Sequence, residues 1–483
     1  MNTHSSFTWP SQPTVSALVS AVLLGGCALL PDAQPRPAPK PIDLYGSARA
    51  FAAPTAKWPD DRWWTAYGDA QLDALVNEAL RGAPSLAMAQ ARLAQALAVA
   101  QSTGASALPQ VGASASVTQQ KQSSNYLSPA AVTPQGWNDY GRATLDFSWE
   151  LDFWGKNRAA IAAATSQAEA ARADVAQARL VLATSVVAAY AEFARLHAAR
   201  DTAAAARDVH AKTAELFRRR HDNGLETLGS VRQVEARRAS AEGDVLVFDE
   251  QLVLQRHRIA ALLGAGPDRG LALNRPAVNL AQPFGLPPEL SAQLLGRRPD
   301  IVAARLRAEA AAARIDQSRA AFYPNVYLVA FAGVQSLGLD QLTRHGSSIG
   351  SMGPALSLPI FDGGRLRGQL RGSEAEYAQA VASYDQAVVQ ALQEVADAAV
   401  SRQALGGQLA RTDEAVDAAR ESWRIQHNRY SGGLATYLDV LAAEDVLLAN
   451  LRTQSDLQSR SFTLDVALVR ALGGGYTIPH QPS

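Results

Sequence analysis

The pattern that most resembles an enzyme motif is Gly346-Ser347-Ser348-Ile349-Gly350, which matches the G-x-S-x-G nucleophile elbow of serine hydrolases. That elbow needs a buried strand before the serine and a helix after it. Here a polar loop precedes the motif and a strand-like segment follows it. We therefore expect neither Ser347 nor Ser348 to act as a nucleophile.

The other residue types that carry chemistry lack the required spacing. The eight histidines are dispersed, with no HExxH or similar ligand pattern, so we expect no metal site. No Walker or Rossmann pattern stands in a suitable context, and we expect no cofactor. The chain has 45 Lys plus Arg and 45 Asp plus Glu, so its charge does not indicate a nucleic-acid partner. The sequence predicts a protein that is not an enzyme.

Cys27 is the single cysteine, so an intrachain disulfide is excluded. It follows Leu24-Gly25-Gly26 at the end of a short apolar run. Small residues before a cysteine resemble a bacterial lipoprotein cleavage site, at which Cys27 becomes the acylated N-terminus. No Lys or Arg precedes the run and Gly25 is not the commonest residue there, so a plain signal peptide or a buried thiol stays open.

We accordingly expect a lipoprotein signal peptide over 1–26, whose apolar run is too short to span a bilayer. Residues 27–68 are then an acylated, proline-rich linker, extended over its first part. Trp63, Trp64 and Tyr67 are expected to anchor its end onto the folded body.

The most informative stretch, residues 141–222, changes its period once. From Arg142 to Leu151 apolar and polar residues alternate, as in a strand with one apolar and one polar face. Residues 156–222 then contain neither Pro nor Gly, which predicts one helix of roughly 100 Å at 1.5 Å per residue. The chain must build something elongated.

The polar face of that strand carries arginine and carboxylates, which cannot lie in a dry core. The wall of a membrane β-barrel fits this pattern, with apolar residues toward lipid and charges toward a water-filled lumen. A surface hairpin with one solvated face is the alternative.

The same succession of elements occurs twice. The first repeat, 69–264, has a short helix and then one from Ser85, strands at about 110–119 and 142–151, the long helix 156–222 and a helix 229–263. The second, 289–473, has strands at about 325–334 and 349–360, a long helix 365–430 and a helix 437–472. Residues 265–288 connect the repeats and 474–483 form a tail. Between strand and long helix we predict two matching hinges: Phe153, Trp154 and Gly155 in the first repeat, Phe361, Gly363 and Gly364 in the second.

Four strands cannot close a barrel, and an open sheet edge cannot face lipid, so a membrane sheet of this size needs several chains. The helices are rich in alanine, which permits close side-by-side packing in the wall of a tube. An alanine-rich bundle or coiled coil is the alternative without the strands. Gly364, Gly368 and Gly372 recur every fourth residue, and we expect them to pack closely against neighbouring helices.

Taken together, the repeats, the Pro-Asn-Val strand entry, Leu358-Pro359-Ile360-Phe361-Asp362-Gly363-Gly364 and the segment from Arg429 to Leu441 resemble a TolC-like outer-membrane efflux protein. The lipoprotein site points to the acylated branch, which partners inner-membrane drug or solute pumps. The resemblance implies a mixed α+β membrane fold: a homotrimer with a transmembrane β-barrel of about twelve strands, continued by a periplasmic α-helical barrel.

The resemblance also implies a function. Such a channel passively conducts drugs or other small solutes through the periplasm and the outer membrane, contacting outer-membrane lipid, a periplasmic adaptor protein and the pump. A periplasmic adaptor, or another lipid-anchored helical protein without a channel, is the alternative function.

By the same resemblance, the turns after the long helices form the periplasmic tip, where the tunnel narrows and meets the adaptor. Leu438 resembles the apolar constriction, and Arg429 and Tyr430 a polar latch. Ala442 stands where relatives place an acidic residue, so Asp439, Glu444 or Asp445 is expected to supply that charge. The adaptor contacts are expected at Asp222, Asn223, Gly224, Leu225, Gly432, Gly433 and Leu434.

Overall fold

The computed structural model describes residues 35–46, 49–51, 53–123, 125, 131–278, 285–287 and 290–477. Cys27 and the expected signal peptide lie outside these residues. The chain divides into two compact units. The first contains Ala94–Ala170 and Ala304–Ser383, together with the described part of Met1–Pro39. The second contains Lys40–Leu93, Ala171–Ala303 and Tyr384–Ser483.

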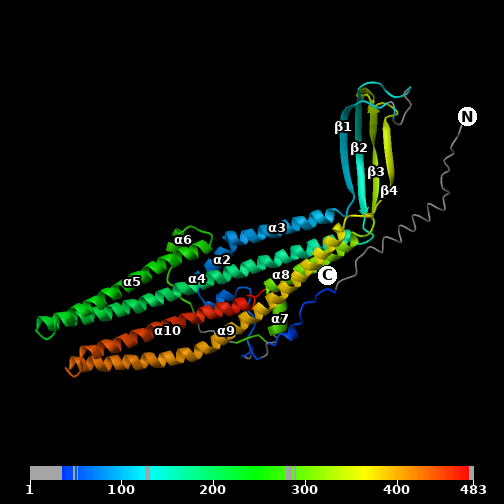
Figure 1. Cartoon of the computed structure of the whole chain (residues 1–483). Coiled ribbons are helices and arrows are strands. Elements are labelled where there is room, and N and C mark those ends of the chain that lie inside the picture. The colour runs from blue at the N-terminus through cyan, green and yellow to red at the C-terminus, as the bar shows by residue number, and fades with distance from the viewer. Residues whose placement is uncertain are drawn as a thin grey trace. The chain divides into compact units, whose positions relative to one another are not determined.

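The first unit contains one antiparallel sheet in the order β1-β2-β3-β4 (Figure 1). Its central pair, β2 with β3, joins the two repeats, since Phe147 lies opposite Ala330 and Leu151 opposite Val326. The outer pairs are hairpins within each repeat. The strands are β1 (Gln110–Gln120), β2 (Asn138–Leu151), β3 (Asn325–Leu337) and β4 (Ser348–Ser357).

Three strand ends differ from our expectation by three or four residues. The strand β2 begins four residues earlier, because Asn138 still pairs with Gln120 at the far end of β1, and β3 continues to Leu337 beside it. By contrast β4 ends at Ser357, opposite the first residue of β3, so the residues up to Ile360 have no ladder partner. Pro354 sits within β4, the edge strand of this sheet, where a missing N–H is tolerated.

The helices reproduce the repeat residue for residue. The long helices α4 (Lys156–Asp222) and α9 (Arg365–Ser431) each have 67 residues. Their partners α5 (Leu228–Leu262) and α10 (Tyr437–Ala471) each have 35 residues. Every end of α9 and α10 lies 209 positions after the corresponding end of α4 and α5.

The shorter helices α3 (Pro84–Ala105) and α8 (Pro299–Ala320) have 22 residues each and begin at a proline. We expected Ser85 to cap the first of them, but Pro84 already lies in its first turn. A proline is well suited to that place, because its fixed φ is helical and its missing N–H would have had no helical partner.

The second unit is built around α4, whose fully buried Tyr190 and Phe193 lie in the main hydrophobic core. The expected anchors, Trp63, Trp64 and Tyr67, are buried in that core within the 3-10 helix η3 (Trp63–Tyr67). The helix α2 (Ala70–Gly82) also belongs to it. The second unit also contains η2 (Ile42–Leu44), α6 (Asp268–Leu271) and α7 (Leu290–Arg297), whereas η4 (Leu339–Gln341) belongs to the first unit.

One 18-residue window of α4 reaches a mean hydropathy of 1.2, and 61% of that window is buried within the chain. Burial in the core explains this apolar composition.

Candidate functional site

The two helix tips of the second unit have the same backbone. Gly224 after α4 and Gly433 after α9 take left-handed φ values of 72° and 73°, which glycine adopts without a steric penalty. In both turns the next N–H donates to a carbonyl five residues earlier, at 2.8 Å. Each turn therefore presents one exposed leucine, Leu225 with 64% and Leu434 with 74% of its surface accessible.

Tyr430 connects the helical hairpin α9–α10 to the hairpin α4–α5. It is buried, its ring stacks on Phe217 with 6.1 Å between centroids, and its hydroxyl donates to Glu226 at 3.2 Å. The Arg220 guanidinium lies 5.0 Å from the ring centroid. Burial raises the pKa of Tyr430 to about 12; Arg220 lowers it and Glu226 raises it further. Tyr430 thus keeps its proton at neutral pH and remains a hydrogen-bond donor.

The predicted neighbours of Tyr430 have separate roles in the protomer. Arg429 donates to the carbonyl of Leu434 at 3.2 Å and so closes its own turn. Asp439 forms a capping box with Thr436, and these hydrogen bonds, from the Thr436 side chain first and then its backbone, lower the pKa of Asp439. Leu438 is 65% exposed, as a residue lining a passage would be.

The two remaining acidic candidates differ in burial. Asp445 pairs with Arg237 of α5 at 2.8 Å and stays half exposed. Glu444 is only 1% exposed, and its carboxylate lies 2.8 Å from Nδ1 of His210 on α4. The expectation that Glu444 supplies charge to an inner ring is therefore wrong, because its side chain points into the protomer. Among the described residues, no hydrogen bond satisfies either of its carboxylate oxygens.

The two hinges of the first unit each contain an aspartate cap that we did not predict from the sequence. The carboxylate of Asp152 accepts from the N–H groups of Asn157 and Arg158, at 3.2 and 2.9 Å. That of Asp362 accepts from Gly364 and Leu366, at 2.9 and 2.8 Å. Each aspartate therefore caps the start of one long helix.

The hydrogen bonds lower the pKa of both aspartates. For Asp152, partial burial acts in the opposite direction and the Arg158 and Asn157 N–H groups outweigh it; for Asp362, the Leu366 N–H contributes most. A signal was present in the sequence, since an aspartate lies next to the aromatic and glycine residues of both hinges.

The predicted hinge residues divide into backbone and surface positions. Gly155, Gly363 and Gly364 have φ values of 78°, 64° and 90°, so each makes a turn that other residues rarely adopt. Phe153 and Phe361 are exposed. Trp154 stacks on Tyr323 at 4.7 Å and donates to the carbonyl of Pro324 at 2.9 Å, which ties the first hinge to the start of β3.

The glycines that recur every fourth residue, Gly364, Gly368 and Gly372, are called the glycine row below, and they have open space beside them. A Cβ placed at Gly368 or Gly372 meets no atom of the described chain within 4 Å. Close packing against helices of the same chain is therefore not the reason for these glycines. Gly372 instead opens a polar groove of about 580 Å³, whose walls include Lys156, Arg314 and Ser373.

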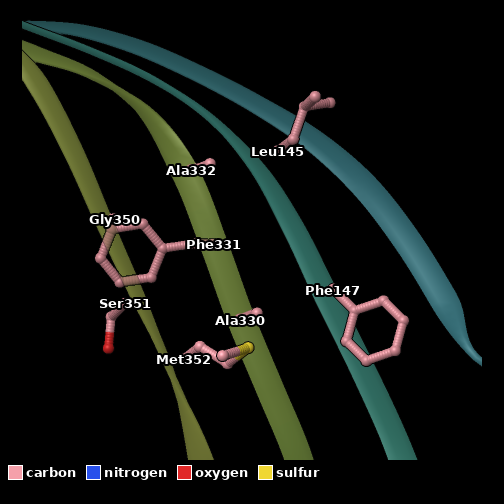
Figure 2. A pocket seen from close by; sticks show the side chains of 8 residues that line it. All are labelled: Leu145, Phe147, Ala330, Phe331, Ala332, Gly350, Ser351 and Met352. Carbon is pink, nitrogen blue, oxygen red and sulfur yellow. The ribbon is translucent and has the colours of Figure 1, made fainter.

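The register gives the sheet one apolar and one polar face. Ala143, Leu145, Phe147, Trp149 and Leu151 share a face with their β3 partners, which are Val334, Ala332, Ala330, Leu328 and Val326. Figure 2 shows part of this surface around a shallow apolar depression of about 500 Å³, lined by Leu145, Phe147, Met352 and neighbours. The depression contains no titratable side chain.

The opposite face carries the charges of β2. Its Ser114 and Thr144 hydroxyls both bond to Asp146, at 3.0 and 3.1 Å, and Arg142 lies 5.2 Å from the centroid of the Phe331 ring. At the hinge end, Glu150 pairs with Lys156. The strand β2, with one apolar face and one face of charged and hydroxyl side chains, has the pattern of a membrane-barrel wall.

Comparison with known proteins identifies the family. The profile described as "Outer membrane efflux protein" matches residues 75–265 and 290–474, which is most of the chain. The chain belongs to this family. It therefore acts as the outer-membrane channel of a tripartite efflux system, as the resemblance seen in the sequence implied.

Two relatives illustrate the match to this efflux protein. It is 32% identical over 469 residues to the multidrug resistance outer membrane protein MdtP of Escherichia coli K12, covering 95% of this chain and 96% of that protein. It is 38% identical over 368 residues to the fusaric acid resistance protein FusA of Burkholderia cepacia, covering 75% and 69%.

Solved structures agree with the fold of this efflux protein. The outer membrane protein VceC of Vibrio cholerae is 50% identical, with a TM-score of 0.83, over 86% of this chain and all of that one. The outer-membrane channel OprN is 29% identical, with a TM-score of 0.81, over 93% and 99%.

These relatives are channel and resistance proteins by name, which fits the interpretation of the serine motif. In this efflux protein Ser348 begins β4 rather than a helix, and the Ser347 hydroxyl donates to the carbonyl of Gln341 at 2.7 Å. Among the described residues, no group of three or more His, Cys, Asp or Glu could hold a metal ion.

We did not predict several contacts at the helix tips from the sequence. Glu226, His210 and Arg237 all come from α4, α5 or their turn, and they bond to the second hairpin. Their partners are more than 200 residues away in the sequence, so no local pattern could pair them.

Proposed function

We propose that three copies of this chain assemble into one channel, with twelve strands forming a transmembrane barrel and the helices forming a periplasmic tunnel. The observation that carries the proposal is the two-faced sheet with two free edges, β1 and β4. Unpaired edge groups are very costly in lipid, so a sheet with an apolar face must be closed by further strands. Three identical four-stranded sheets close such a ring.

The glycine row supports contact with another copy. Gly368 and Gly372 leave open space within the chain, and a helix of a neighbouring copy fits such a row because it can approach closely. In this assembly each tip residue occurs three times around the axis. Leu438 then forms an apolar ring, and the exposed Leu225 and Leu434 face the adaptor.

The remaining parts of the proposal follow from the sequence. Residues 1–26 are a signal peptide, Cys27 is acylated, and 27–68 lead from the lipid anchor to the first repeat. Residues 265–288 connect the two repeats. The exported compounds are drugs or other small solutes, and the names of MdtP and FusA support this class.

The test is reconstitution of the purified protein in planar bilayers. We expect trimers in detergent and stepwise channel conductance, because a closed barrel conducts ions. A monomer without channel conductance would contradict the proposed trimeric barrel. Gly368→Leu serves as a second variant: it should leave the protomer folded, since nothing lies within 4 Å, but lower the trimer yield. A normal trimer yield would place the glycine row in solvent.

A further inference from the structure

The two hinges together form a surface that the channel function does not by itself require. All four strands meet the hinges at one end of the sheet, where β2 ends at Leu151 and β4 at Ser357. Beyond these ends, four large apolar side chains are exposed by 52% to 91%: Phe153, Trp154, Ile360 and Phe361. They follow directly on the ends of β2 and β4 along the chain. We call this set, with the arginines described next, the hinge belt.

Basic residues follow the apolar ones directly. The first turns of α4 and α9 contain no acidic residue, and Arg158, Arg365, Arg367 and Arg371 are all exposed. Basic side chains are unfavourable near the positive end of a helix, so some other interaction must compensate for their position. Two of these arginines have partners in the chain: Arg158 pairs with Asp152 at 3.4 Å, and Arg365 donates to the side chain of Gln369 at 3.1 Å.

The second turn of α9 has the same excess of positive charge. Glu374 and Glu376 lie opposite arginines of α8, at 3.9 Å from Arg319 and 3.8 Å from Arg314. Within the described chain, Arg367 and Arg371 have no ion pair or side-chain hydrogen bond. At Arg367 and Arg371 the belt therefore presents cations that have no partner in the described part of the protomer.

We propose that the hinge belt binds the phosphate groups of phospholipids at the periplasmic surface of the outer membrane. The proposal rests on the sheet spanning that membrane. Aromatic side chains prefer the membrane–water interface, and arginines next to them can reach lipid phosphates. At 1.5 Å per residue Arg365 and Arg371 are roughly 9 Å apart along α9, and a headgroup layer is roughly 5 to 8 Å deep. Flexible side chains can bring both guanidinium groups into it.

Charge complementarity favours an anionic lipid over a neutral one. The aromatic residues set the depth of the hinge by their apolar contact, while the arginines bind phosphate oxygens in bidentate fashion. The belt thereby fixes the height of the channel in the bilayer, so that the caps at Asp152 and Asp362 stay in water.

The test compares Arg365→Gln/Arg367→Gln/Arg371→Gln with a control on the same helix, Arg411→Gln/Arg420→Gln/Arg424→Gln. The control arginines are exposed but pair with Glu414, Asp417 and Glu421. Purified trimers are incubated with vesicles of phosphatidylethanolamine, with or without phosphatidylglycerol. They are then extracted in detergent, and the phospholipid retained per chain is measured by native mass spectrometry.

We expect the belt variant to retain on the order of tenfold less phosphatidylglycerol than wild type, since each basic residue at an anionic surface contributes independently. The control should retain the wild-type amount, and lysine at the three belt positions should restore most of it. Equal retention by wild type and belt variant would overturn the proposal. Loss of the trimer in the belt variant, with rescue of assembly by lysine, would assign the arginines to the interface between copies and also overturn it.

Channel conductance in the same samples separates this inference from the proposed function. A belt variant that conducts normally but loses lipid supports both. Absence of conductance in wild type would contradict the channel proposal itself.

Discussion

The two helix tips share one backbone but have different side-chain partners. Position for position, Tyr430 of the second tip corresponds to His221 of the first, and Glu444 to Glu235. Tyr430 and Glu444 are buried against the other hairpin, whereas His221 is only half-buried and Glu235 bonds to Arg218 and Arg232 of its own hairpin. The two repeats thus share the backbone of the turn. The buried side chains that join the two tips, Tyr430 and Glu444, both come from the second tip.

Because Tyr430 is buried and His221 is not, we expect the largest effect on stability and conductance at Tyr430. Tyr430→Ala removes a buried ring from the stack with Phe217, which should cost about 3 kcal/mol and release the second hairpin. We expect a lower denaturation midpoint and a higher single-channel conductance. The control is His221→Ala, which should change neither. Equal effects at both positions would show that the tips are interchangeable.

We expect the second-largest effect on stability at the buried carboxylate of Glu444. Glu444→Ala leaves the largely buried His210 without its ion-pair partner, and we expect a loss of about 2 kcal/mol in the free energy of unfolding. The matched variant Glu235→Ala breaks only exposed ion pairs, which contribute little. Chemical denaturation of the detergent-solubilised protein measures both. A larger loss at Glu235 would contradict the difference in burial as the cause.

A third variant addresses conduction with little change in stability. Leu438 takes the place of Gly229 in the first tip, and Arg429 closes the second turn. Leu438→Ala with Arg429→Ala should raise single-channel conductance in planar bilayers, because the apolar ring is removed and the turn loosened. Ser347→Ala serves as the control and should conduct normally. If the double variant folds, trimerises and conducts like wild type, the constriction lies elsewhere in the channel.

The smallest effect concerns pH. The pKa of Asp439 is lowered in the folded protein, so its capping box stabilises the second tip fully above the unfolded pKa of about 3.9 and loses this contribution as the pH falls through the folded value. The first tip has Ser230 at this position, which does not titrate. Hydrogen exchange, corrected for its intrinsic pH dependence, should show acid loosening only around Thr436. Equal loosening of both tips would exclude the capping box as the cause.

The hinges show how much a local pattern can reveal. Alternation in β2 and the following Pro- and Gly-free run predicted a strand, a sharp turn and a helix, because these depend on backbone and side-chain preferences of neighbouring residues. We did not predict the capping role of Asp152 and Asp362, although each lies next to predicted hinge residues. The glycine row was predicted to pack closely against neighbouring helices; the sequence did not show that the space beside it within the chain is open, because this depends on what lies beside the helix.

The sequence by itself determined the repeat, the lengths of the long helices and the two faces of the sheet, since periodicity and glycine positions encode them locally. Only the tertiary structure decided which equivalent residues are buried. Glu444 and Glu235 are the same residue type at the same repeat position, yet Glu444 is buried against His210 and Glu235 is only half-buried, paired with Arg218. That difference comes from which neighbouring helix lies against each position, and such contacts between distant residues have no local signature.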